Sequence, residues 1–333
     1  MDMSQYHAYL ADKPYVLTGE EKPYFVGRWF ESLVQDAPHM ITLTDGAYAC
    51  FLVDNADYVR FQTTPLTKMT SCIAYTLDNS DPVRQSVDDT VIPLPDKGCH
   101  ILTIIADGMP EWEGKWTHER GLALFEIAPA QGGVLLGVKP TGKTIFFYGD
   151  SITEGSHALG DVACNGNSAT CAYPWFCAKA LGCTPYYVGY GGSGVLREGS
   201  LNTFYMTIDW LAYERPLAYE PVPHVIVVNH GTNDGETRDV DFETTLRHSL
   251  THMRERYPNV PFVYMIPFMQ TKAHIIREVV AKFDNAYVVE TSHLAMTYSD
   301  GVHPDPKGAK LAGEMLADAL QNIFGKDFFS HKE

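Results

Sequence analysis

Short alternating segments of apolar and polar residues fill the first part of the chain. The stretch MITLTDGAYACFLVD (40–54) carries Asp45-Gly46 between two such segments, a pair typical of a β-hairpin turn. Further short runs follow, separated by turn residues: SCIAYTLD (71–78), TVIPL (90–94), CHILTIIAD (99–107) and GLALFEIA (121–128). Many short strands with turns at this spacing predict an antiparallel β-sandwich.

The pattern changes after Pro140. Near-continuous apolar runs of strand length now alternate with longer stretches that can form helices, and the runs lie at 143–149, 184–189, 224–231, 262–267 and 286–290. Strands buried on both faces and alternating with helices predict a parallel α/β layer structure. A Gly-rich segment at 130–142 lies where the pattern changes. We therefore expect a β-sandwich domain at 1–136 and an α/β domain at 137–333.

Composition argues against several classes of partner. The 333 residues include 41 acidic and 25 basic ones, giving a net charge of −16 without any basic cluster. This balance argues against nucleic acid and against an anionic membrane surface as partners. No apolar stretch approaches the length of a membrane span, and no secretory signal is visible at the N-terminus, so we expect a cytoplasmic protein. The sequence leaves the oligomeric state open.

Cysteine and histidine spacing does not suggest a metal site. The seven cysteines are an odd number, which argues against a disulfide framework. Four of them are close in sequence but lack the C-x-x-C spacing of zinc sites: Cys164, Cys171, Cys177 and Cys183. His248 and His252 are four residues apart, without the Glu of H-E-x-x-H. We expect reduced thiols, no metal and no cofactor.

Candidate chemistry begins at FFYGDSITEG (146–155), where a predicted strand ends at Ser151. Functional groups of parallel sheets gather beyond the carboxyl ends of the strands. A serine nucleophile needs a base, and the base needs an orienting group. His303, with Asp300 three residues before it in SDGVHPDPKG, is the candidate base. Ser151, His303 and Asp300 therefore form a candidate catalytic triad.

Two other strand ends offer donors for an oxyanion. GYGGSG (189–194) provides unobstructed backbone N–H groups, notably that of Gly192, and NHGTNDG (229–235) provides the amide of Asn233. Together with the N–H of Ser151, these groups predict an oxyanion hole. Asp150 is expected to fix the nucleophile turn rather than to act as a second acid.

The segment GYGGSG has two other interpretations. It matches the dinucleotide-binding pattern G-x-G-x-x-G, with Asp209 at a suitable distance, but no amphipathic helix follows and it does not lie in the first α/β unit. Ser193 resembles the nucleophile of a G-x-S-x-G elbow, but Val195 replaces the last Gly. We reject both interpretations.

These blocks resemble those of the SGNH (GDSL-type) hydrolases: GDSIT with Ser151, GYGGSG with Gly192, GTND with Asn233, and DGVH with Asp300 and His303. The second block departs from the family pattern, because Tyr187 stands where an Asn is usual. The resemblance covers roughly 143–324 and implies a flavodoxin-like α/β/α fold with metal-free esterase chemistry. An N-terminal jelly-roll-like β-sandwich, with GRWFE at 27–31, is similar to carbohydrate esterase family 2. That family implies removal of acetyl groups from plant glycans.

The resemblance implies an esterase acting on acetylated manno- or xylo-oligosaccharides through an acetyl-enzyme. Aromatic residues that could contact such a substrate are Trp112, Trp116, Tyr190 and Trp210, although Trp112 and Trp116 could instead pack at the domain interface. A general short-chain or lipid esterase, an O-acetyltransferase and a non-catalytic carbohydrate-binding protein are the alternatives. The intact Ser151, Asn233 and His303 argue against the last of these.

Overall fold

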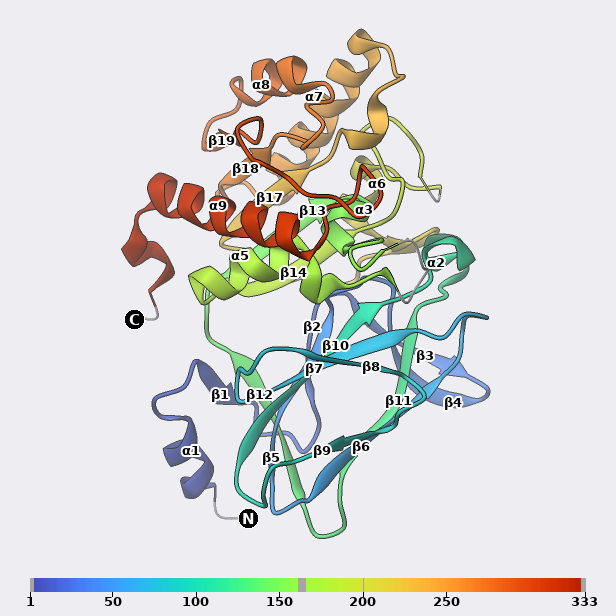
Figure 1. Ribbon diagram of the computed structural model, residues 1–333, viewed down its shortest axis with the longest axis vertical. Helices are drawn as coiled ribbons and strands as arrows, with labels where there is room; N and C mark the ends of the chain where they lie inside the picture. Colours follow the sequence, from blue (N-terminus) through green and yellow to red (C-terminus); the bar gives the residue numbers. More distant parts are fainter. Residues whose placement is uncertain (1–2, 161–165, 200, 331–333) are drawn as a thin grey trace.

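The first half of the protein is a two-sheet β-sandwich in the computed structural model, which describes residues 3–160, 166–199 and 201–330 (Figure 1). After a short helix, α1 (Ser4–Leu10), one sheet has the order β1-β12-β5-β10-β7-β8, and β2 also pairs with β5. Its strands are β1 (Tyr15–Leu17), β2 (Tyr24–Val26), β5 (Tyr48–Asp54), β7 (Cys72–Leu77), β8 (Val83–Ser86), β10 (His100–Gly108) and β12 (Val134–Pro140). The other sheet has the order β3-β4-β11-β6-β9: β3 (Trp29–Val34), β4 (Ala37–Thr42), β6 (Tyr58–Thr64), β9 (Val91–Pro93) and β11 (Leu122–Pro129). These strand pairs are antiparallel, so the predicted sandwich is confirmed.

The expected hairpin at Asp45-Gly46 is wrong. β4 pairs with β3 and β11, whereas β5 pairs with β2, β10 and β12 in the other sheet. The turn therefore carries the chain from one sheet to the other. Local turn chemistry cannot distinguish this crossover from a hairpin, because a Gly with φ 86° serves both.

The sheet that contains β5 and β10 is covered on both faces. Phe51 of β5 and Leu102 of β10 point into the sandwich interior, whereas Cys50, Leu52 and Ile101 belong to a core shared with the second half of the chain. Every residue of β10 is buried. This double covering explains why six of the nine residues of CHILTIIAD are apolar and occur on both faces of the strand.

The second half is an α/β/α layer structure. Its parallel sheet has the order β14-β13-β17-β18-β19, with β13 (Thr144–Gly149), β14 (Thr184–Gly189), β17 (Val225–Asn229), β18 (Phe262–Met265) and β19 (Ala286–Val289). Helices α5 (Tyr173–Leu181) and α9 (Pro306–Phe324) pack together on one face. Helices α7 (Asp239–Arg256) and α8 (Ala273–Val280) cover the other (Figure 1). The predicted α/β/α fold is confirmed.

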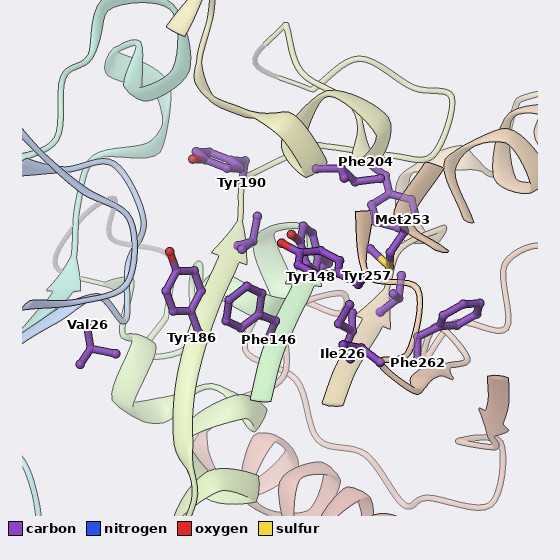
Figure 2. Packing of buried hydrophobic residues seen from close by; sticks show 14 of the residues in the cluster. Val26, Phe146, Tyr148, Tyr186, Tyr190, Phe204, Ile226, Met253, Tyr257 and Phe262 are labelled. Carbon is purple, nitrogen blue, oxygen red and sulfur yellow. The ribbon is translucent and has the colours of Figure 1, made fainter. Parts of the chain in front are cut away.

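The connection between the halves runs through β12, which includes the expected boundary at 136/137. β12 remains paired with β1 and β5 up to Pro140, and β13 begins at Thr144. The apolar core is continuous across this connection, since Val26 of β2 belongs to the same cluster as Phe146 and Tyr148 of β13 (Figure 2). Among the described residues, no helix combines the length and apolarity needed to span a bilayer.

A buried arginine joins the two halves. Arg28, in the turn before β3, has a fully buried side chain whose Nε donates to Glu220 at 2.9 Å. Its Nη1 donates to the carbonyls of Thr207 at 2.8 Å and Trp210 at 3.2 Å. Removing Arg28 takes the nearest cation away from the buried carboxylate of Glu220, which is costly.

Arg28→Ala is therefore expected to lower the free energy of unfolding by about 3–5 kcal/mol. Urea denaturation of the full chain measures the change. Lys97→Ala is the control, because the Lys97–Asp57 pair is 60% and 67% exposed and is expected to change stability by about 0–1 kcal/mol. Equal effects of the two substitutions would contradict this role of Arg28.

Candidate active site

Ser151 is the first residue of a one-turn helix, α3 (Ser151–Glu154), directly beyond the carboxyl end of β13. Asp150 caps this helix, its carboxylate accepting from the N–H of Ile152 at 3.0 Å. Gly149 is required here, because a Cβ at this position would lie 1.9 Å from Oγ1 of Thr153. The turn holds Ser151 at the end of the sheet with 7% of its surface exposed.

His303 and Asp300 lie beside Ser151, on the loop between β19 and α9. Nε2 of His303 is 2.9 Å from Oγ of Ser151, and Nδ1 is 2.7 Å from Oδ2 of Asp300. Oδ1 of Asp300 accepts from the N–H groups of Val302 and His303. Partial burial opposes ionisation, but these backbone hydrogen bonds and the imidazole outweigh it and lower the pKa of Asp300 to about 2. The ionised carboxylate holds the proton of His303 on Nδ1, which leaves Nε2 free to accept from the serine.

The predicted oxyanion donors follow three neighbouring strands of the sheet, β13, β14 and β17. Gly192 lies in the loop after β14 with φ 69°. Among the described residues, the N–H groups of Ser151 and Gly192 donate to no acceptor, so both remain available. Asn233 connects the nucleophile turn to the loop that carries Gly192. Its Nδ2 donates to Oδ2 of Asp150 at 3.2 Å and to the carbonyl of Ser193 at 3.0 Å.

Asp234, next to Asn233, is a residue that the sequence reasoning missed. Its carboxylate accepts from the consecutive N–H groups of Val195, Leu196 and Arg197 at 2.8–2.9 Å. The GTND segment thereby fixes the continuation of the loop that carries Gly192. Its position directly after Asn233 could have marked it as a site residue. The N–H groups that it binds, however, are nearly forty residues away in sequence.

His157 was also missed. Its ring stacks on that of His303, with centroids 5.0 Å apart and an interplanar angle of 30°. The N–H of His157 donates to the side chain of Asn167, whose Nδ2 donates to the carbonyl of Met109 in the sandwich. The candidate base therefore packs on a residue that Asn167 links to the sandwich.

A buried cluster of charges connects the sandwich to the nucleophile turn. Nζ of Lys115 lies 2.6 Å from Asp45 and 3.0 Å from Glu154. Oγ of Ser156 lies 2.8 Å from Glu111 and 2.7 Å from Glu154. One hydroxyl proton can serve only one of these two carboxylates, so the short second contact requires a proton on a glutamate.

Burial raises the pKa values of several carboxyl groups in this region. It raises the pKa of Asp45 and that of Glu154 to about 7, although Lys115 opposes both shifts. Burial, with the nearby carboxylates of Asp234 and Glu154, raises the pKa of Asp150 to about 8 against the hydrogen bond from Ile152. Each of these carboxyl groups therefore binds a proton more readily in the folded protein than in the unfolded chain.

The four aromatic residues expected to contact substrate differ in position. Trp112 is 75% exposed on the short helix η1 (Glu111–Glu113), and a Cβ placed on Gly192 would lie 3.9 Å from its Cη2. Trp116 and Tyr190 are 1% and 2% exposed and pack edge to face, 5.1 Å apart, so neither offers a ring face to a sugar. Figure 2 shows Tyr190 within the buried aromatic cluster. Trp210 is 37% exposed, at the end of α6 (Phe204–Asp209), and its carbonyl binds Arg28.

The cysteine cluster gives no metal geometry in the part of the chain that the structure describes, where no group of three or more His, Cys, Asp or Glu side chains could hold an ion. Cys171, Cys177 and Cys183 are free thiols, and burial raises the pKa of Cys177 well above its usual value. Cys164 lies outside the described residues.

Comparison with known proteins agrees with this architecture. Residues 147–311 match the model of the GDSL-like Lipase/Acylhydrolase family, whereas no curated protein sequence matches the chain. An active-site mutant of a family two carbohydrate esterase from Clostridium thermocellum superposes with a TM-score of 0.75 at 19% identity, covering 92% of this chain and 99% of that one. A family two carbohydrate esterase from Cellvibrio japonicus gives 0.72 at 19%, covering 95% and 98%. An acetyl xylan esterase from the rumen bacterium Butyrivibrio proteoclasticus gives 0.68 at 16%, covering 94% and 98%. The chain thus shares the fold of these carbohydrate esterase structures.

The raised pKa of Asp45 predicts a pH dependence of stability. Between pH 4 and pH 7 the folded state keeps the Asp45 proton while the unfolded state loses it, so the contribution of this group to stability falls as pH rises. The unfolding free energy of the wild type should therefore decrease relative to that of Asp45→Asn over this interval and level off above pH 7. Urea denaturation of both proteins at pH 4.5, 5.5, 6.5 and 8 measures this difference. A difference that stays constant or grows with pH would contradict the assignment.

Proposed function

We propose that this protein is a serine esterase that removes O-acetyl groups from carbohydrates, namely acetylated manno- or xylo-oligosaccharides, through an acetyl-enzyme. The observation that carries the proposal is the hydrogen-bonded chain Ser151–His303–Asp300 at the carboxyl end of the parallel sheet. The carbohydrate esterases with the same two-part fold support the substrate class, and one of them, from Clostridium thermocellum, was solved in complex with cellohexaose.

The geometry supports a two-step acyl transfer. His303 takes the hydroxyl proton as Oγ of Ser151 bonds to the acetyl carbonyl carbon, and the carbonyl oxygen becomes an oxyanion. The carbon–oxygen bond to the sugar then breaks, and the sugar oxygen takes the proton from His303. Water repeats the sequence on the acetyl-enzyme, releasing acetate and restoring Ser151. Asp300 stabilises the imidazolium in both steps.

Oxyanion stabilisation is assigned to the N–H groups of Ser151 and Gly192. In this structure both amide hydrogens of Asn233 are directed at Asp150 and Ser193. Asn233 can donate to the oxyanion only if one of these hydrogens leaves its present acceptor. Its contacts also hold the nucleophile turn against the Gly192 loop.

Trp112 is the aromatic residue best placed to contact the sugar. Its exposed indole stands next to Gly192, one of the two assigned oxyanion donors, and we place the sugar ring against it. Trp210 is the second candidate for this role. Substrate contact through an indole face is consistent with a neutral, polyhydroxylated ligand.

The proposed activity predicts that acetylated manno- or xylo-oligosaccharides release acetate, and that Ser151→Ala lowers the rate by a factor of about 10⁴ or more because it removes the nucleophile. Ser249→Ala, a buried serine of α7 that donates to Thr245, is the matched control and should keep the wild-type rate. Acetate assays with 4-nitrophenyl acetate and butyrate alongside compare the substrate classes. Cleavage of longer acyl esters alone would indicate a general or lipid esterase, and activity that survives Ser151→Ala would refute the serine mechanism.

Trp112→Ala is expected to raise KM for acetylated oligosaccharides by about 3- to 10-fold, the worth of one aromatic contact. The same variant should keep its KM for 4-nitrophenyl acetate, because that substrate lacks a glycan. Steady-state kinetics on both substrates test this difference. A parallel rise for both would show that Trp112 supports the catalytic groups instead.

A further inference from the structure

We infer that Glu111 of the β-sandwich is a positioning residue for the loop that carries Gly192, an inference that rests on the proposed esterase function. Glu111 opens the helix η1 and is only 7% exposed. It comes from the N-terminal half of the chain, whereas the loop that it contacts follows β14 in the other half. With Glu111, the active site draws on residues from both halves of the chain.

Glu111 occupies the space above Gly191. A Cβ at Gly191 would overlap the carboxylate of Glu111, so a side chain there would force Glu111 out of its present position. The backbone of Gly191 does not have a positive φ, so conformation alone does not require glycine at this position. The absence of a side chain is needed to admit Glu111.

The same carboxylate reaches the nucleophile turn. Oε2 of Glu111 accepts from Oγ of Ser156 at 2.8 Å, and the N–H of Ser156 donates to the carbonyl of Ser151 at 2.9 Å. One side chain thus touches both the segment that presents the nucleophile and the loop that presents the Gly192 N–H. The distance between these groups sets the fit to an oxyanion.

The far side of the loop is held independently. Asp234 binds the N–H groups of residues 195–197, and a Cβ at Gly192 would lie 3.4 Å from Cα of Gly199. The α/β half therefore fixes the continuation of the loop by itself. On the side of Gly191, Asn233 binds the carbonyl of Ser193 from the α/β half, and Glu111 adds a contact from the sandwich.

The test compares Glu111→Ala with Glu111→Gln in the full chain. Glu111→Ala should lower kcat for 4-nitrophenyl acetate by about 10- to 100-fold with little change in KM, as expected when a transition-state donor is misplaced. Glu111→Gln keeps the shape and an acceptor for Ser156, so it should restore most of the rate. Glu113→Ala is the matched control, because the Glu113 carboxylate on the same helix binds only the N–H groups of Lys68 and Met69 among the described residues.

A second variant tests the contact from the other side. Gly191→Ala should displace Glu111 and lower kcat to a similar extent. Adding it to Glu111→Ala should cost much less than it costs in the wild type, because the collision no longer exists. Independent, multiplicative effects would overturn the inference.

Amide hydrogen exchange of the peptide 189–199 provides a readout that does not need turnover. Faster exchange in Glu111→Ala, with wild-type exchange in Glu111→Gln and Glu113→Ala, supports the positioning role even if the wild type releases no acetate, an outcome that would refute the proposed function alone. Unchanged kcat and exchange in folded Glu111→Ala would overturn the inference. Equal effects of Glu113→Ala would also overturn it, since they would assign the order of the loop to the helix η1 as a whole.

Discussion

The structure depends on one constraint, which is that the apolar sheet of β5 and β10 must be covered on both of its faces. The second sheet of the sandwich covers one face, and the α/β half covers much of the other. An antiparallel sheet that left its outer face in water would carry polar residues there, whereas β10 is buried throughout. The two halves therefore share one core. The loops that follow β10 are consequently brought to the carboxyl end of the parallel sheet.

The interface between the two halves also contains buried charged side chains, each paired with an opposite charge or bound by hydrogen-bond donors. Arg28 enters the α/β half and meets Glu220, Lys115 bridges Asp45 and Glu154, and Asp107 of β10 accepts from Ser168 and Thr170. Buried ion pairs add little net stability compared with apolar contacts, because desolvation offsets their attraction. Their geometry is demanding, however, so they fix how the sandwich sits on the α/β half. In this protein that orientation places Glu111 on Gly191 and Trp112 beside Gly192.

The proposed chemistry uses local and distant residues in different ways. Asp300 and His303 are three residues apart, and one loop forms their contact through two backbone hydrogen bonds and one side-chain bond. Ser151 joins them from 152 positions away only because β13 and the loop before α9 end at the same edge of the sheet. Asn233 and Asp234 connect such segments through hydrogen bonds.

The sequence by itself determined the fold class of both halves and the candidate residues at the strand ends. Periodicity reports the burial of each strand face, and short motifs such as GDSIT and DGVH contain their own local geometry. Only the tertiary structure decided that Asp45-Gly46 crosses between sheets, that Trp116 and Tyr190 are core residues while Trp112 is exposed, and that Glu111, Lys115 and His157 belong to the site's surroundings. These outcomes depend on how the two sheets of the sandwich and the α/β half pack against one another. A pattern along the chain records that a residue is apolar or charged, but the partner that covers or neutralises it is set by packing between segments far apart in sequence.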